Sequence, residues 1–325
     1  MPAKQRTLRS ISLVIPVFNE VESLGYLRKE LERWLPSLGD VTAEVLLVDD
    51  GSRDGSLPFL AQWAADDSRV KVISFSRNFG HQAAVSAGLQ YARGEAVAVL
   101  DADLQDPLDV VHDMIARYEE GYDVAYGQRV TRHGETRFKL ATAWLFYRIM
   151  RFGVHKELPV DAGDFRLISR RCVDSINAMP ETHRFLRGMV AWSGFPQVGV
   201  PYERAGRRFG ETKYSLRKML RFAWNAITSF STIPLKLMTA VGAIFFLLGL
   251  GAGAYALSSH IFGHTVPGWT SLMGFNALAD GLVLIGLGLI GDYVGKIYEE
   301  VKRRPLYIIQ RAINVDEKEG APDNR

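Results

Sequence analysis

The chain has 325 residues, of which 47% are hydrophobic and 23% charged, and its formal net charge at pH 7 is +3. This composition predicts a folded protein of one large domain or two ordinary ones, and the small net charge gives no reason to expect a nucleic-acid partner. A single cysteine, Cys172, excludes an internal disulfide framework and favours a reducing compartment.

Apolar, β-branched runs alternate with helical patterns over the first 126 residues. The expected strands are Ile11–Pro16, Glu44–Val48, Val70–Phe75, Ala96–Leu100 and Val124–Tyr126. The expected helices are Glu22–Leu38, Ser56–Ala65, Gln82–Ala92 and Leu108–Glu120. Continuous apolar strands that alternate with helices predict an α/β fold with a mostly parallel sheet covered on both faces. Ligands of such sheets bind beyond the carboxyl ends of the strands, so functional residues should directly follow each strand.

Polar and acidic residues do follow the first four expected strands. The segments are, in order, "PVFNE", "DDGSRDGS", "SRNFGH" and "DADLQD". The first strand is not followed by G-x-G-x-x-G, and the sequence contains no G-x-x-x-x-G-K-[ST]. Dinucleotide and P-loop sites are therefore not expected.

Asp101 and Asp103 flank a single residue, Ala102, directly after a strand. Two like charges held close together are unfavourable unless something offsets them, and a hard divalent cation would do so. Mg²⁺ typically takes one or two protein carboxylates and completes its shell with water and phosphates. A D-x-D pattern alone is equally compatible with a turn that binds nothing. Asp106, which precedes Pro107, is expected to be a helix N-cap.

Two long apolar segments, 233–259 and 269–295, follow the α/β region. Each is long enough to cross a bilayer, although a buried helical hairpin is the alternative. Lys and Arg flank the pair on both sides and are absent from the connecting loop, which predicts a cytoplasmic location for both flanks. Asp280 in the second segment is either a neutral acid or a partner of another helix, so that a homo-oligomer is plausible.

Residues 215–231 combine an apolar face at helical spacing with a basic face. Such a helix beside a membrane span is expected to lie in the headgroup layer. Packing on the α/β domain is the alternative, and the two arrangements are compatible. The expected organisation is a cytosolic catalytic domain (1–214), this interfacial helix, two transmembrane helices and a cytosolic tail (296–325).

The strand-end motifs, in this order, resemble those of the inverting family 2 glycosyltransferases with the GT-A nucleotide-diphosphosugar fold. Three further motifs resemble the polyprenyl-phosphate branch of that family: "GQR" at 127–129, "DAGDFRLISR" at 161–170 and "RRFGETKYS" at 207–215. That branch includes dolichol-phosphate mannose synthase and the bactoprenol glucosyltransferases. The two C-terminal spans and "IYEEVKRRPLYII" match its bacterial members, so the resemblance covers nearly the whole chain.

The resemblance implies roles for individual residues. Those that would contact the base and ribose are Pro16, Phe18, Glu20, Val48 and Asp50. Those that would meet the ribose and diphosphate are Asp101, Ala102, Asp103, Arg207 and Lys213. The ligands of Mg²⁺ or Mn²⁺ would be Asp101, Asp103 and Gln105. The catalytic group would be Asp164, together with Arg129 and Arg166 near the sugar or the acceptor phosphate.

The implied acceptor is a lipid phosphate, which carries about −1.5 to −2 charge at neutral pH and needs little help from a general base. The four cations Arg129, Arg166, Arg207 and Lys213 would offset repulsion between acceptor and donor. Asp164 would orient an arginine or the sugar rather than remove a proton. Arg151, Arg187 and His81 are expected to be solvated or structural, whereas Arg77 could equally reach the nucleotide or not.

The implied function is inverting transfer of a hexose from a nucleotide diphosphate sugar, with UDP-glucose expected, to polyprenyl (undecaprenyl) phosphate. The reaction would take place at the cytoplasmic face of the bacterial inner membrane. Its product would be used for the modification of cell-envelope glycans. Alternative donors are aminoarabinose, mannose, galactose or N-acetylhexosamine nucleotides. A processive polysaccharide synthase is disfavoured because Q-x-x-R-W is absent from the sequence. A non-catalytic membrane scaffold remains the alternative from a different class.

Overall fold

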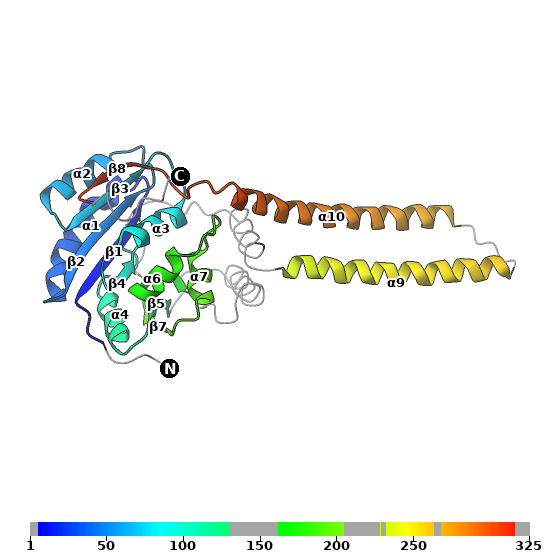
Figure 1. The fold of residues 1–325 in the computed structure, drawn as a ribbon, viewed down its shortest axis with the longest axis horizontal. Helices are drawn as coiled ribbons and strands as arrows, with labels where there is room; N and C mark the ends of the chain where they lie inside the picture. Colours follow the sequence, from blue (N-terminus) through cyan, green and yellow to red (C-terminus); the bar gives the residue numbers. More distant parts are fainter. Residues whose placement is uncertain (1–5, 131–161, 205–227, 229–231, 263–267, 316–325) are drawn as a thin grey trace. The chain divides into compact units, whose positions relative to one another are not determined.

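The structure is a computed structural model that describes residues 6–130, 162–204, 228, 232–262 and 268–315. The chain divides into two compact units (Figure 1). The first consists of residues 1–216 and 304–325, and the second of residues 217–303.

The described part of the first unit is built on an eight-stranded sheet with the order β7-β5-β6-β4-β1-β2-β3-β8. The strands are β1 (Ser10–Val17), β2 (Thr42–Asp49), β3 (Val70–Phe75), β4 (Ala96–Val99), β5 (Val124–Arg129), β6 (Ala162–Ser169), β7 (Gln197–Tyr202) and β8 (Ile309–Ile313). Strands β3, β2, β1 and β4 are parallel neighbours, as are β5 and β7, whereas β6 and β8 are antiparallel to their partners. The predicted mostly parallel α/β sheet is therefore confirmed.

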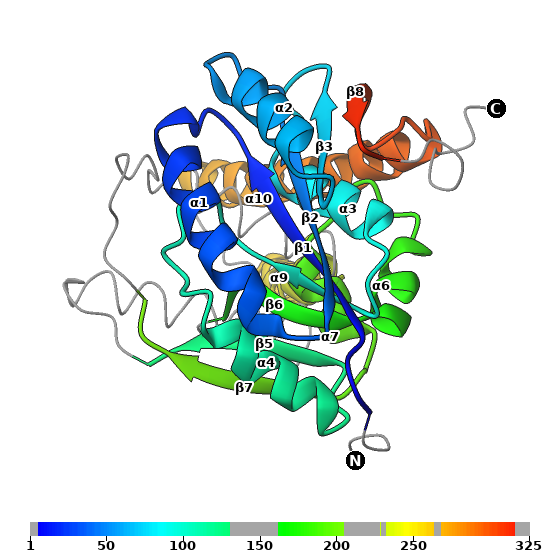
Figure 2. The same cartoon turned by 90° about the vertical axis from the view of Figure 1, so that its left-hand side faces the viewer.

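Helices cover both faces of this sheet (Figure 2). They are α1 (Val21–Trp34), continued by a 3₁₀ turn (Leu35–Leu38), α2 (Ser56–Asp66), α3 (His81–Tyr91), α4 (Val110–Glu119), α6 (Arg170–Asn177) and α7 (Leu186–Trp192). Alternate residues of β2 face opposite layers: Val45 and Leu47 pack with residues of α1, α2 and α4, and Val48 packs with residues of α3. Burial on both faces explains why these strands are continuously apolar.

The strand register aligns the carboxyl ends of the central strands at one edge. Pro16 of β1 lies opposite Val48 of β2, and Val14 lies opposite Val99 of β4. On the other side of β4, Val99 lies opposite Arg166 of the antiparallel β6. The motifs that follow β1, β2 and β4 are therefore neighbours, and the start of β6 meets them at the same edge.

Two local expectations were wrong. Helix α4 begins at Val110, with Asp109 and not Asp106 as its N-cap residue. The carboxylate of Asp106 instead accepts a hydrogen bond from the hydroxyl of Tyr202, at 2.5 Å, so a partner from β7 prevails over local capping. The range 296–325 is also not simply a tail, because helix α10 continues to Val301 and β8 pairs with β3.

The second unit contains two long helices, α9 (Ile233–Ile261) and α10 (Trp269–Val301). Their apolar stretches, Ile233–Tyr255 and Leu278–Val301, have mean hydropathies of 2.0 and 1.5 and are long enough to cross a membrane. The expected interfacial helix, 215–231, lies outside the described residues except for Thr228.

Gly94, just before β4, packs closely against the backbone of β1, and a substitution at this position tests that packing. A Cβ at this position would lie 2.6 Å from the backbone nitrogen of Ser12 and 2.7 Å from the carbonyl carbon of Ile11. Backbone atoms of a central strand cannot move aside, so we expect Gly94→Ala to lower the free energy of unfolding by about 3 kcal/mol. Thermal unfolding of the purified protein in detergent measures this loss.

The matched control is Gly25→Ala in helix α1, where an added Cβ would meet nothing within 4 Å. This substitution should raise stability by about 0.5–1 kcal/mol, because alanine is the better helix former. Equal melting temperatures for the two variants would contradict the packing described for Gly94.

Candidate active site

The loops after β1 and β2 are hydrogen-bonded to each other. The backbone nitrogen of Asn19 donates to Ser52 Oγ, and that of Arg53 donates to Asn19 Oδ1, both at 2.9 Å. The backbone nitrogen of Glu20 donates to Ser56 Oγ at 3.1 Å. The polar residues of "DDGSRDGS" thus hold the "PVFNE" loop in place. Beside them, the ring of Phe18 is 44% exposed, an unusual position for a large apolar side chain and one compatible with stacking on a base.

Asp50 fastens the loop that follows β3. Its carboxylate accepts hydrogen bonds from Asn78 Nδ2 at 2.9 Å, from the backbone nitrogen of Phe79 at 2.7 Å and from that of Gly80 at 2.9 Å. The side chains of Asp50 and Val48 are both buried. Val48 and Asp50, two of the residues expected to contact the base, therefore lie at the bottom of the expected site. Any contact that they make with a base would involve their backbone atoms. Asn78 therefore supports this turn.

Three acidic residues, Asp101, Asp103 and Asp106, lie close together in the segment after β4. Burial raises the pKa of Asp101 to about 6, and the nearby negative charges of Asp106, Asp164 and Asp103 add to this rise, while His81 opposes it. Arg204, two residues after β7, lies 3.3 Å from Asp106 Oδ1 and 3.9 Å from Asp101 Oδ2. The side chain of Asp101 is 36% exposed. Within the described part of the chain, burial and these acids outweigh the effect of His81, so the charged form of Asp101 is disfavoured.

Carboxyl groups that raise one another's pKa in this way fit a site for a divalent cation. Among the described residues no three His, Cys, Asp or Glu side chains form a complete metal cage. Mg²⁺ does not need one, because it commonly binds one or two carboxylates and keeps the remaining positions for substrate phosphates. Ala102 is buried in the core between the two candidate ligands, Asp101 and Asp103. The backbone nitrogen of Gln105 donates to Asp103 Oδ1 at 3.2 Å and thereby braces that carboxylate.

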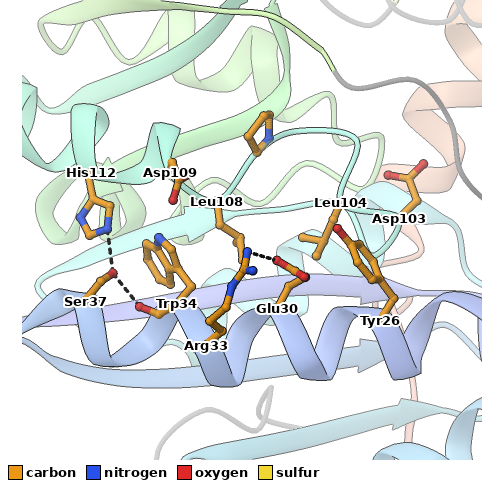
Figure 3. Close-up of a pocket in the computed structure, with 11 residues that line it drawn as sticks. Tyr26, Glu30, Arg33, Trp34, Ser37, Asp103, Leu104, Leu108, Asp109 and His112 are labelled. Atoms are coloured by element: carbon orange, nitrogen blue, oxygen red, sulfur yellow. Dashed lines mark hydrogen bonds and ion pairs between the residues drawn. The ribbon is translucent and has the colours of Figure 1, made fainter.

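A groove of about 350 Å³ runs from Asp103 between α1 and the segment that leads into α4 (Figure 3). At its far end His112 is hydrogen-bonded to Ser37, at 2.9 Å. Along one wall Arg33 and Glu30 form an ion pair at 2.7 Å. Asp103 is its only lining residue among the expected site residues, so the groove borders the expected nucleotide site and does not coincide with it.

Asp164, in β6, is the centre of a second charged group that we call the Asp164 cluster: Asp164, His81, Gln82 and Arg187. Arg187 Nε lies 2.8 Å from Asp164 Oδ1, while His81 Nε2 and Gln82 Nε2 lie 3.2 Å and 3.3 Å from Oδ2. The side chain of Asp164 is only 14% exposed. Gln82 also accepts a hydrogen bond from the backbone nitrogen of Leu186, which connects the start of α3 to the start of α7.

The cluster keeps Asp164 ionised. Burial favours the neutral acid, but the charges and hydrogen bonds of Arg187 and His81 outweigh it, so the pKa of Asp164 lies well below its ordinary value. Burial also opposes the charged form of His81, and the hydrogen bond and charge of Asp164 outweigh it, so the pKa of His81 is raised. The expectation that Arg187 is a solvated surface charge was therefore wrong, because it forms an ion pair with Asp164. His81 is 43% exposed, as a solvent-facing residue would be, and it is also hydrogen-bonded to Asp164.

Two of the expected cationic residues lie against Gly163, the neighbour of Asp164. Arg166 Nη2 donates to the carbonyl oxygen of Gly163 at 2.8 Å, and a Cβ at Gly163 would come within 3.2 Å of Arg129 Nη2. Arg166 is buried, and burial lowers its pKa to about 10. Arg166 thus supports, from within the protein, the start of strand β6 that carries Asp164. Arg129 extends from the end of β5 and donates to the hydroxyl of Tyr202 at 3.3 Å.

The remaining expected residues fall into two groups. Glu20 directly precedes α1, where its Oε2 accepts a hydrogen bond from Ser23 Oγ, and Pro16 lies near the end of β1. Arg207, Lys213 and Arg151 lie outside the described residues. His81 had one usable signal in the sequence, since it stands in the polar segment after the third strand.

A family model described as glycosyl transferase family 2 matches residues 12–176. The chain is 43% identical to YkcC, an uncharacterised glycosyltransferase of Bacillus subtilis (strain 168), over 94% of this chain and 95% of that one. It is 38% identical to a prophage bactoprenol glucosyl transferase homologue of Escherichia coli (strain K12), over 93% and 98% of the two chains. It is 37% identical to a bactoprenol glucosyl transferase of Shigella phage SfII, again over 93% and 98%.

Proposed function

The chain belongs to glycosyl transferase family 2, and we propose that it transfers a hexose, from UDP-glucose in the first instance, to polyprenyl phosphate. The family match and the mostly parallel sheet confirm the α/β fold of GT-A type. The observation that carries the proposed reaction is the pairing of two charged groups at one edge of this sheet. One is the group of Asp101, Asp103 and Asp106, whose charges raise the pKa of Asp101, and the other is the Asp164 cluster with its cations.

Full-length similarity to proteins named bactoprenol glucosyl transferase supports a lipid phosphate as the acceptor. The two long apolar helices support the same acceptor, because an enzyme that acts on a membrane-bound lipid must itself be at the membrane. The charge pattern around these helices favours the cytoplasmic face of the inner membrane for the catalytic domain. The proposal is also compatible with another nucleotide sugar as the donor. It is equally compatible with a homo-oligomer.

On the donor side, the ring of Phe18 would stack on the base, with Pro16 and Glu20 beside it. Asp101 and Asp103, with Gln105, would hold Mg²⁺ or Mn²⁺, which when bound stabilises negative charge on the departing diphosphate. Arg207 and Lys213 would contact the same diphosphate. The exposure of Phe18 and the raised pKa of Asp101 among neighbouring acids support these roles.

On the acceptor side, an oxygen of the lipid phosphate would form a bond to the anomeric carbon. The bond from that carbon to the diphosphate oxygen would break, and its electron pair would leave with the nucleotide diphosphate. A phosphate dianion has no proton to lose, so no base is required. Asp164, held as an anion by three donors, suits the role of a fixed counter-ion for neighbouring cations.

The proposal is tested with membranes that contain the protein and a panel of nucleotide sugars. We expect UDP-glucose to yield a lipid whose mass equals polyprenyl phosphate plus one hexose, and we expect EDTA to abolish its formation. A product from another nucleotide sugar would change the assigned donor. The absence of any glycolipid, with the protein folded and membrane-bound, would favour the scaffold alternative.

A further inference from the structure

We infer that His81 binds the acceptor phosphate directly, as an imidazolium oriented by Asp164. This inference rests on the proposed function and adds a substrate-binding residue to it. Neither the motifs in the sequence nor the resemblance to polyprenyl-phosphate glycosyltransferases assigned a role to His81.

The first support is the position of His81. It is the first residue of α3, directly after the loop that Asp50 fastens, at the carboxyl edge of the parallel strands. Its side chain remains 43% exposed although one ring nitrogen is bound to the mostly buried Asp164. A cation held at the start of a helix is unfavourable with respect to the helix dipole, so His81 is not there to stabilise α3.

The second support is the donor geometry of the ring. His81 uses Nε2 toward Asp164 Oδ2. A protonated imidazole donates from both nitrogens, so Nδ1–H is the second donor of the same ring. The contact with Asp164 fixes the plane of the ring and favours its charged form. This is the arrangement in which a histidine offers one charge-assisted hydrogen bond to a phosphate oxygen.

The third support is the balance of charge around the ring. Among the described residues, the charged groups that act on His81 are Asp164 from β6, Asp101 from the loop after β4, Arg187 from α7 and Asp50 from the loop after β2. Three of these four are acids, so the ring is held in a negative environment. The acceptor dianion could not approach these acids without a cation between them and the phosphate. His81 is exposed and bound to one of them, so it can supply that charge.

The test compares His81→Gln with His81→Lys in the purified, full-length protein. Glutamine can still donate to Asp164 but carries no charge, whereas lysine keeps the charge. For His81→Gln we expect the KM for polyprenyl phosphate to rise about tenfold, the size of one lost charge-assisted hydrogen bond. For His81→Lys we expect a KM between those of the glutamine variant and the parent. The KM for the nucleotide sugar should change less than the KM for polyprenyl phosphate.

The pH profile separates this role from a purely structural one. The imidazolium exists below the raised pKa of His81, so its advantage is present at low pH and is lost as the pH rises through that value. The ratio of the acceptor KM of His81→Gln to that of the parent should thus be about ten near pH 6 and fall toward one at high pH. Taking the ratio cancels the ionisation of the acceptor itself, which occurs near pH 6.

His112→Gln serves as the control, because His112 lies at the far end of the groove and contacts Ser37. It should leave the acceptor KM unchanged at every pH. A KM ratio of one for His81→Gln throughout the pH range would overturn the inference while leaving the proposed function intact. Transfer by the parent protein to a neutral acceptor, and none to polyprenyl phosphate, would refute both.

Discussion

Replacement of Asp103 by alanine is expected to reduce kcat/KM for glycolipid formation roughly 10³-fold, because the charge stabilisation that a bound metal supplies amounts to several kcal/mol. Asp101 and Asp103 follow the same strand, and the pKa of Asp101 is raised to about 6 by burial and by the charges of neighbouring acids. Removing one carboxylate removes the reason for a cation to bind there. We also expect nucleotide diphosphate to bind the variant without a requirement for Mg²⁺ or Mn²⁺, and more weakly than the parent binds it.

Asp109→Ala is the matched control, since Asp109 is an exposed aspartate in the same segment and makes no side-chain cap on α4. It should retain parental turnover and the parental metal requirement. Activity of the parent protein after chelation, or parental turnover of Asp103→Ala, would eliminate the metal site and with it the proposed assignment of the D-x-D motif.

Replacement of Asp164 by asparagine is expected to lower kcat/KM about 10²-fold, the equivalent of roughly 3 kcal/mol in charge-assisted contacts. Asparagine has almost the same shape as aspartate, but an NH₂ group replaces one of the two carboxylate oxygens. This NH₂ group would face either Arg187 or His81, and both of these residues are themselves hydrogen-bond donors. Both cations would then lose their counter-ion. We expect the loss to appear mainly in the KM for the lipid phosphate, measured by varying the acceptor at saturating nucleotide sugar.

The same variant should reveal how pH controls the cluster. The lowered pKa of Asp164 adds stability that is present above about pH 4 and is lost as the pH falls, whereas the raised pKa of His81 adds stability that is lost as the pH rises above about 6.5. The melting temperatures of the parent and Asp164→Asn should therefore differ most between these two values.

Asp174→Asn provides the comparison for removal of an exposed charge. Asp174 is 61% exposed and lies 3.6 Å from Arg170. Asp174→Asn should lower the free energy of unfolding by about 0.5 kcal/mol or less and leave the rate of sugar transfer unchanged. If Asp164→Asn behaved like Asp174→Asn in both stability and acceptor KM, the Asp164 cluster would have no role in binding the acceptor.

Much of the candidate site could be predicted without the structure. The alternation of apolar strands and helices is a local pattern, and in a parallel sheet it leads to one edge at which all the strands end. The positions of Phe18, Asp101 and Asp103 at that edge follow from this pattern. So does the presence of two segments long enough to cross a membrane, because length and hydropathy are properties of contiguous residues.

The two antiparallel strands, β6 and β8, could not be predicted in this way. Strand β6 inserts between β4 and β5, and β8 returns after α10 to pair with β3. Each of these segments pairs with a strand that is distant in the sequence from it. Pairing across a sheet depends on strand order, and nothing in the short-range periodicity specifies that order.

The sequence by itself determined the α/β class, the edge that carries the chemistry and the acidic pair at Asp101 and Asp103. Only the tertiary structure decided which charges meet. His81 and Asp164 are 83 residues apart, and Arg187 lies on a third element, yet their side chains form one hydrogen-bonded cluster. The physical reason is that electrostatic contacts act through distances in space, and the insertion of β6 beside β4 sets those distances.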